Sequence, residues 1–258
     1  MEQRYLTTHG LVLKHLSLGE SDRRIVLLVP GVGKIIAKAR GAKNLNSPFN
    51  GRLMPANICN LLLYRTPGGS WTITQCQTIE TFGSLKQDLL KASLALAVLD
   101  IVDRCTEMET PSDELFALTK IFLETIDSSQ HQEKQEKTEL LFLAYQIQIL
   151  DILGILPSFT ECVRCHKKVS IETLPGWHPL EMLCEICLHQ SSQIAYELYE
   201  NNYLKLLNFL RGRHLADSIK VKLSTAEQYT LKTILQTLWG AQSFSIPKSL
   251  GVLETLRA

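Results

Sequence analysis

The hydrophobic pattern of the chain changes its period once, at Ser84, and this limits the fold more than any other feature of the sequence. Before Ser84, short apolar runs are separated by residues that favour turns, mainly Gly, Pro, Asn, Asp and Ser. After Ser84, apolar residues recur at the three- and four-residue spacing of helices. The sequence therefore predicts an α+β protein with two domains, a β domain at residues 1–80 and an α-helical domain at residues 81–258.

The first domain contains five segments that are typical of strands. They cover residues 10–18, 23–29, 34–42, 55–66 and 71–79. In the first of them, simple alternation places Val12, Lys14 and Leu16 on one face. A small sheet removes its exposed edges most simply by closing on itself. We therefore expect a five-stranded β-barrel.

Helix signals begin at the change of period. Ser84 with Gln87 forms a capping-box pattern for a first helix, and the segment from Thr110 places Pro111 in the first turn of a second. Further helices are expected at residues 138–153, at residues 194–210, and from a second capping box at Ser224 to about Trp239. Residues 138–153 are apolar nearly all round, which predicts a central helix covered on several sides.

The composition excludes several classes of protein. Hydrophobic residues make up 45% of the 258 and charged residues 21%, as in an ordinary globular chain. The most apolar segment, residues 140–156, carries Gln146, Gln148 and Asp151 and is too short and polar for a membrane span. The first residues lack a secretory signal pattern, and an odd number of cysteines, seven with four of them clustered, does not fit a disulfide framework. We expect a cytoplasmic protein with reduced thiols and no membrane association.

Four of the seven cysteines form two C-x-x-C pairs, Cys162 with Cys165 and Cys184 with Cys187. Eighteen residues separate the pairs, and this spacing is typical of a zinc site. Four thiolates fill a tetrahedral shell and leave no position for water or substrate. The sequence therefore predicts one structural Zn²⁺ that organises an insert at about residues 158–190.

Other interpretations of the cysteines stay open at this point. One C-x-x-C pair could be a redox pair of the thioredoxin type, although the strand-to-helix turn that such pairs require is missing. His166, His178 or His189 could replace a cysteine as a ligand, and the four thiols could also hold no metal.

The charge of the chain is unevenly distributed. Residues 1–80 hold ten Lys and Arg against four Asp and Glu, whereas residues 81–258 hold seventeen against twenty-two. A basic first third on a mildly acidic remainder favours contact between the first third and a polyanion.

Part of the positive charge follows one predicted strand. Alternation places Lys34, Ile36, Lys38 and Arg40 on one face and small apolar residues on the other. The neighbouring cations are Lys43, Arg52, Arg23 and Arg24, and the aromatic side chains that could stack on bases are Tyr64 and Trp71. The pattern fits a nucleic-acid interface, and it is equally compatible with the solvated outer face of a barrel strand.

No catalytic motif competes with this interpretation. The sequence lacks a phosphate-binding loop of the G-x-x-x-x-G-K-S/T type, a G-x-S-x-G elbow and an H-E-x-x-H pair. We therefore expect a protein that is not an enzyme. A zinc-stabilised protein–protein adaptor without direct DNA binding is the alternative to a DNA-binding protein.

Residues 19–49, GESDRRIVLLVPGVGKIIAKARGAKNLNSPF, resemble the N-terminal signature of the bacterial recombination mediator family RecO. The order of parts, with a small barrel, a helical body and a C-x-x-C insert, resembles that family over nearly the whole chain. Pro30 departs from the small residue, often threonine, that precedes the hairpin in the family. This departure affects only the expected geometry of the turn.

The resemblance implies an OB-fold barrel, binding of single- and double-stranded DNA, and annealing of complementary strands. It also implies loading of RecA onto DNA coated by single-stranded-DNA-binding protein, with RecR and the acidic C-terminal tail of the coating protein as partners, in the nucleoid region of the cytoplasm. Carried onto this chain, it gives as zinc ligands the four cysteines named above, and as DNA contacts Lys34, Lys38, Arg40 and Lys43, with Arg23 and Arg24 added.

Overall fold

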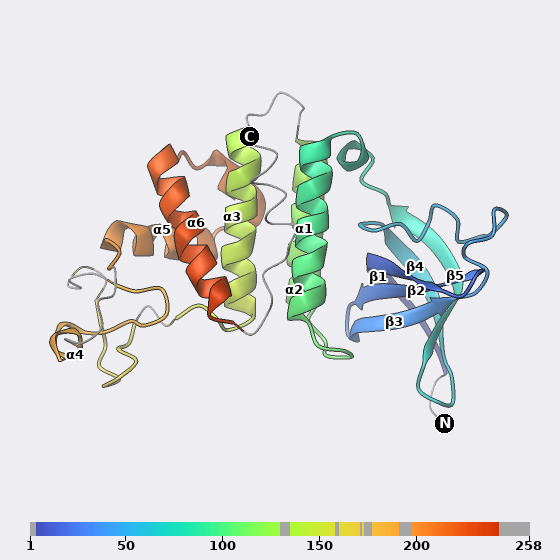
Figure 1. The fold of residues 1–258 in the computed structure, drawn as a ribbon, viewed down its shortest axis with the longest axis horizontal. Coiled ribbons are helices and arrows are strands. Elements are labelled where there is room, and N and C mark those ends of the chain that lie inside the picture. The colour runs from blue at the N-terminus through green and yellow to red at the C-terminus, as the bar shows by residue number, and fades with distance from the viewer. Residues whose placement is uncertain are drawn as a thin grey trace. The chain divides into compact units, whose positions relative to one another are not determined.

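The computed structural model of the chain describes residues 4–129, 135–157, 160–170, 172, 177–190 and 198–242. The chain divides into two compact units, with the described residues 4–129 in the first and 135–242 in the second. The first unit contains the barrel together with two helices, and the second contains the cysteine segment and the remaining helices (Figure 1). The predicted boundary at residue 80 separates the barrel strands from the first helices and stays a prediction for the domains.

Five strands close into a barrel in the order β1-β2-β3-β5-β4. Their bounds are Tyr5–Leu18 (β1), Asp22–Val29 (β2), Gly33–Ala39 (β3), Ile58–Arg65 (β4) and Trp71–Glu80 (β5). All neighbours are antiparallel except β3 and β5, which pair in parallel over two residues. The predicted α+β class and the five-stranded barrel of OB type are confirmed.

Alternate side chains of the strands fill the barrel. On β3, Ile35, Ala37 and Ala39 are fully buried, as predicted from the alternation. Phe49 and Leu53 from the loop after β3 join the same core cluster. The loop is therefore anchored to the barrel by its own apolar side chains.

A β-bulge in β1 changes the predicted faces of that strand. Val12 pairs with Leu27 and is buried, whereas Lys14 pairs with Val26 and is exposed. The prediction that Val12 and Lys14 share a face was wrong. Leu13 is an extra residue in the strand, and one extra residue moves all later side chains to the opposite face.

The helices of the first unit begin later than predicted. They are the 3-10 turn η1 (Ser84–Lys86), α1 (Leu89–Cys105) and α2 (Asp113–Ser128). Asp88 caps α1 by accepting a hydrogen bond from the backbone N–H of Lys91 at 3.1 Å. The prediction that Ser84 is the N-cap was wrong, because the chain first makes the 3-10 turn that buries Leu85. Pro111 lies before α2 and not in its first turn.

Polar contacts fasten these helices to the barrel. The side chains of Lys14 and Lys34 both reach Asp103 near the end of α1. The segment before α2 adds to the free edge of β3, where the backbone N–H of Glu109 donates to the Lys34 carbonyl at 2.8 Å. These contacts explain why the barrel and the first two helices form one compact unit.

The second unit is built around α3. Its helices are α3 (Gln135–Ile152), α4 (Glu185–His189), α5 (Asn201–Gly212), the 3-10 helix η3 (Leu215–Lys220) and α6 (Thr225–Gly240). The described side chains of α3 are mostly buried, and α3 contacts η3, α5 and α6. The predicted central helix is confirmed, and so is the capping box at Ser224.

Two polar side chains of α3 make specific contacts inside the second unit. The Gln146 side-chain oxygen accepts a hydrogen bond from the buried indole of Trp239 at 3.2 Å. The Gln148 amide donates to the carbonyls of Leu210 and Arg213, both at 2.8 Å. It thereby supplies donors for carbonyls at the C-terminal end of α5, which lack partners within the helix. The helix predicted from residue 194 begins at Asn201, and residues 191–197 lie outside the described part of the chain.

No helix among the described residues has the length and apolar character that a membrane crossing requires.

Candidate nucleic-acid interface and metal site

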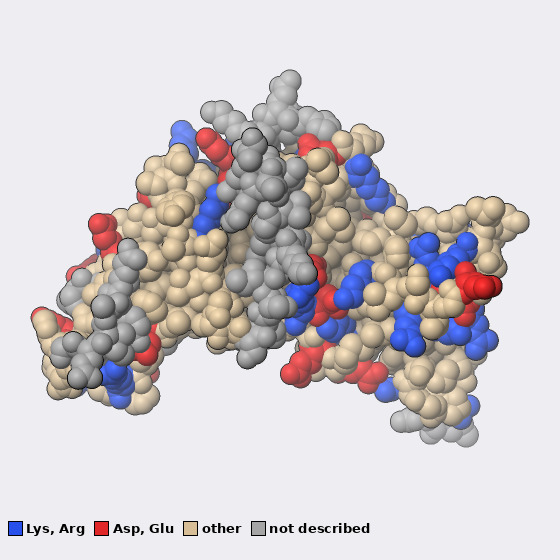
Figure 2. Space-filling model, viewed as in Figure 1, with Lys and Arg blue, Asp and Glu red and all other residues tan. Residues whose placement is uncertain are grey.

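Lysine and arginine side chains gather over the strands of the barrel (Figure 2). The strand register places Arg24 of β2 opposite Lys38 of β3, and Lys38 opposite Thr72 of β5. Paired residues on neighbouring strands share a face, with Cβ atoms about 5 Å apart. Arg40 lies in the turn directly after β3 and is exposed. Arg24, Lys38 and Arg40 form the basic face of the barrel, a name used in this sense below.

Lys38 has an acidic neighbour on this face. Its ammonium pairs with Asp22 at 2.9 Å and remains 40% exposed. The hydrogen bond from Lys38, together with one from the backbone N–H of Gly41, holds the pKa of the Asp22 carboxyl below its ordinary value. In the described structure Arg24 and Arg40 form no ion pair, so their charges are open to a ligand.

The other predicted basic contacts are placed differently. Lys34 points to the end of α1, where Asp103 binds it and leaves 12% of its side chain exposed. Lys43 donates to the carbonyl of Gly19 at 2.6 Å and supports the turn between β1 and β2. Arg23 pairs with the buried Ala39 and so lies on the opposite face from Arg24.

His15 of β1 pairs with Ile25 of β2, and the charge of Arg23 affects its pKa. Burial lowers the pKa of His15, and the positive charge of Arg23 lowers it further. Because its cross-strand partner Ala39 belongs to the barrel core cluster, Arg23 lies on the inward side of β2. Arg24 and Arg40 of the basic face are therefore exposed, whereas Lys34 is engaged by Asp103.

The two predicted aromatic contacts also differ from each other. Tyr64 contacts Tyr5 across β4 and β1, with the ring centroids 5.0 Å apart and the rings tilted by 44°, and Tyr5 is 54% exposed. Trp71 packs against the barrel core, its indole N–H donates to Glu109 at 2.8 Å, and the Arg65 guanidinium lies over its ring. Tyr64 is half-buried beside the exposed Tyr5, whereas the Trp71 ring is already engaged by Glu109 and Arg65.

Arg52 lies in the loop after β3, on another part of the outer surface. Its guanidinium donates to the carbonyl of Cys76 on β5 at 2.9 Å and borders a groove over β4 and β5. The sequence did not indicate Tyr5 or the groove. Alternation alone identifies the outward residues of each strand, but the strand register is needed to show which of them meet.

The four cysteines of the two C-x-x-C pairs come together in the second unit. Their Sγ atoms all lie within 4.8 Å of one another, and those of Cys165 and Cys184 are 3.6 Å apart. Tetrahedral zinc with Zn–S bonds of about 2.3 Å requires sulfur–sulfur distances of about 3.8 Å. The donor set and its spacing therefore fit Zn²⁺. The cluster forms without a histidine among its members, and no disulfide joins any of the seven cysteines, all of which lie in described ranges.

The local backbone holds the sulfurs in place. His166 has a positive φ of 57°, and its N–H donates to the Cys162 carbonyl at 2.9 Å, which makes the tight turn of the first pair. The N–H of Val163 donates to the Met182 carbonyl at 2.9 Å and links the two halves of the segment. Cys187 comes from the short helix α4.

The two buried thiols of the cluster ionise differently. Burial opposes ionisation of Cys162, but hydrogen bonds from nearby backbone groups outweigh it and lower its pKa to about 6. For Cys187, a hydrogen bond to Cys184 and burial raise the pKa to about 12. Cys162 therefore forms a thiolate more easily than Cys187 does.

Comparison with protein families agrees with this arrangement. The family model described as Recombination protein O N terminal matches residues 1–82. The model described as Recombination protein O C terminal matches residues 86–250. The chain belongs to the RecO family.

RecO relatives match nearly the whole chain. The DNA repair protein RecO of Alkaliphilus metalliredigens is 27% identical over 236 residues, which cover 90% of this chain and 91% of the relative. The RecO protein of Syntrophomonas wolfei is 25% identical over 256 residues, with 97% of each chain covered. That of Halalkalibacterium halodurans is 26% identical over 251 residues, with 96% and 94% covered. Membership of the RecO family places the chain among proteins of recombinational DNA repair.

Proposed function

We propose that the chain is a non-enzymatic DNA-binding mediator of recombinational repair, and that the basic face of the barrel is its contact with DNA phosphates. The observation that carries the proposal is the cross-strand placement of Arg24 and Lys38, with Arg40 beside them. Exposed cations on paired strands can follow the phosphates of one DNA strand. Tyr64 and Tyr5 lie on the same outer row, one strand beyond Thr72, and can stack on bases.

The proposed mechanism is electrostatic. The basic face neutralises phosphates, so two complementary strands can approach each other on the protein with less repulsion. Base pairing between the strands then does the specific part of annealing. Binding of both single- and double-stranded DNA is part of this proposal, because phosphates are common to both.

The proposal extends to partners and place of action. By its family, the chain acts with RecR and with the acidic C-terminal tail of single-stranded-DNA-binding protein, and it assists the loading of RecA onto coated strands. It works in the cytoplasm, associated with the nucleoid. In the second unit, Cys162, Cys165, Cys184 and Cys187 hold one structural Zn²⁺, which supplies a fixed tetrahedral link between the two halves of the segment.

The basic face can be tested by neutralising two of its cations. The double variant Lys38→Gln/Arg40→Gln is expected to bind single-stranded DNA on the order of tenfold to a hundredfold more weakly at low salt, because two charge-assisted contacts are lost. The slope of log affinity against log salt concentration should become less steep by about 1.4, since each phosphate contact on a single strand contributes about 0.7. Fluorescence anisotropy titration of a labelled oligonucleotide over a salt series measures both quantities.

The matched control removes the same charge from the second unit, with Lys205→Gln/Lys222→Gln, because both lysines are exposed. The control should bind like the parent chain. Equal binding by parent and the Lys38/Arg40 variant across the salt series would show that this face is not the interface. Capture of a protein partner by a parent chain that shifts no DNA at low salt would favour the adaptor instead.

A further inference from the structure

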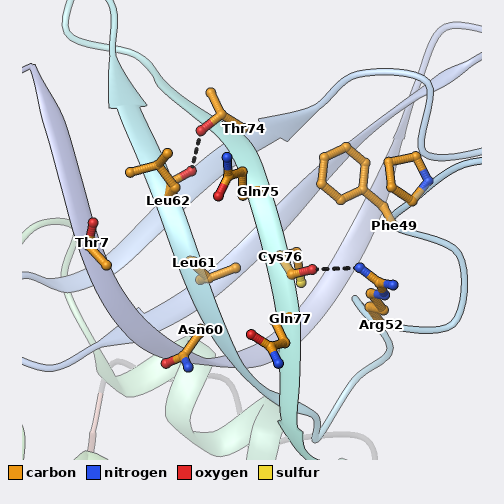
Figure 3. Close-up of a pocket in the computed structure, with 11 residues that line it drawn as sticks. Thr7, Phe49, Arg52, Asn60, Leu61, Leu62, Thr74, Gln75, Cys76 and Gln77 are labelled. Atoms are coloured by element: carbon orange, nitrogen blue, oxygen red, sulfur yellow. Dashed lines mark hydrogen bonds between the residues drawn. The ribbon is translucent and has the colours of Figure 1, made fainter.

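A groove of about 420 Å³ lies on the outer surface of the barrel over β4 and β5 (Figure 3). Thr7 of β1 stands at one side of it, and Phe49 and Arg52 of the loop after β3 stand at the other. Its volume falls within the range of about 300–1,000 Å³ that is common for ligand pockets. The proposed phosphate contacts make no use of this groove.

Neutral amide side chains dominate the polar lining of the groove. Asn60 and Gln77 are cross-strand partners on β4 and β5, and Gln75 lies two residues from Gln77 on the same outward side. All three side chains are exposed, and within the described structure none of them hydrogen-bonds to another protein group. Each amide offers both donors and an acceptor. The groove therefore presents a set of free hydrogen-bonding groups that a ligand can use.

The charge of the lining is weakly positive. Arg52 is its one charged residue, and one guanidinium nitrogen of Arg52 is fixed to the Cys76 carbonyl at 2.9 Å. This bond holds the side chain at the rim, where its remaining N–H groups stay available. A groove with one cation, free amides and no carboxylate suits a ligand that is polar and anionic overall, with neutral hydrogen-bonding parts.

The groove is continuous with the proposed DNA-binding surface. Thr7 and Leu62, which line it, are cross-strand partners, and two residues further along the same strands lies the contacting pair Tyr5 and Tyr64. Tyr64 pairs with Thr72, and Thr72 pairs with Lys38. A row of cross-strand neighbours thus leads from the basic face, past two aromatic rings in contact, to the edge of the groove.

We propose that this groove binds the unpaired bases of a single strand while the basic face holds its phosphates. This inference rests on the proposed DNA binding and adds to it a source of preference for single strands. Asparagine and glutamine amides pair with the hydrogen-bonding edges of bases. In a duplex the Watson–Crick edges are already paired, so the groove can act only on a single strand. The phosphate contacts treat both forms alike.

The test uses the variant Asn60→Ala/Gln77→Ala of the full chain. Both side chains are exposed, so their loss should leave the barrel folded. The probes are a single-stranded oligonucleotide of mixed sequence, the same oligonucleotide with abasic sites along its length, and the corresponding duplex. The control variant, Gln87→Ala/Asn208→Ala, removes two exposed amides elsewhere.

The variant should bind the ordinary single strand roughly tenfold more weakly than the parent does, because two base contacts are lost. It should bind the abasic strand and the duplex like the parent, with an unchanged salt slope, since its charges are intact. Equal affinity of variant and parent for the ordinary strand, or an equal loss on duplex and single strand, would overturn the inference. A parent chain that binds none of the three probes would instead overturn the proposed function, and the inference with it.

Discussion

Replacement of Cys162 and Cys187 with serine is expected to release the metal and to unfold the segment that carries the four cysteines. Among the described residues of this segment, one core cluster has three buried members, and two of the three are the cysteines themselves. In zinc-finger peptides the free energy of zinc binding is about 10–16 kcal/mol, and it stabilises the folded state. Its loss is therefore large for a core cluster with three buried members. The amides of Val163 and Leu188, which donate to Met182 and Cys184, should lose their protection from hydrogen exchange.

The metal content and coordination of the parent chain are measured at the same time. The parent should hold one zinc per chain with four sulfur neighbours at about 2.3 Å in X-ray absorption. DNA affinity of the serine variant should stay within about twofold of the parent, since distant sites add nearly independently. Cys105→Ala, outside the cluster, is the control and should keep the metal. A serine variant that keeps its zinc would contradict the assigned ligands.

The substitution Gly33→Ala is expected to destabilise the first unit by about 3–5 kcal/mol. Gly33 begins β3 with a φ of 93°, a conformation that disfavours any side chain, and a Cβ there would overlap the backbone carbonyl of Thr110. Thr110 belongs to the segment that fastens the first two helices to the barrel. Relief of the overlap would therefore require the helices to move away from β3.

Urea unfolding of the parent and of the variant measures this effect. Gly31→Ala is a matched control, because Gly31 also has a positive φ but a Cβ there would meet nothing within 4 Å. The free energy of unfolding of the control should fall by only about 1 kcal/mol, which is the cost of placing alanine at a positive φ. Similar losses in the free energy of unfolding for the two variants would show that the close approach of Gly33 and Thr110 adds no cost of its own.

The sequence was sufficient for features that depend on local spacing. The alternation in β3 identified Ile35, Ala37 and Ala39 as interior residues, and the two C-x-x-C pairs identified the cysteines that meet. Both patterns arise within short stretches of chain. Period-two strands and two-residue turns leave few other geometries available.

The rest depended on contacts between distant residues. Lys34 looks like its neighbours on the strand, but Asp103, which binds it, lies 69 residues away. Trp71 is engaged by Glu109, 38 residues further along the chain. The bulge that moves Lys14 to the outside of the barrel has no local signal in β1. Such pairings are decided by the closed barrel as a whole and not by any one segment.

The central claim is that DNA contacts the basic face of the barrel, and lysine footprinting tests it most directly. The parent chain is acetylated briefly with and without a single-stranded oligonucleotide, and each lysine is quantified by mass spectrometry. We expect DNA to protect Lys38 several-fold and to leave the exposed Lys205 and Lys222 of the second unit unchanged. Unchanged reactivity of Lys38, with protection instead at Lys167 and Lys168 beside the cysteines, would contradict the account.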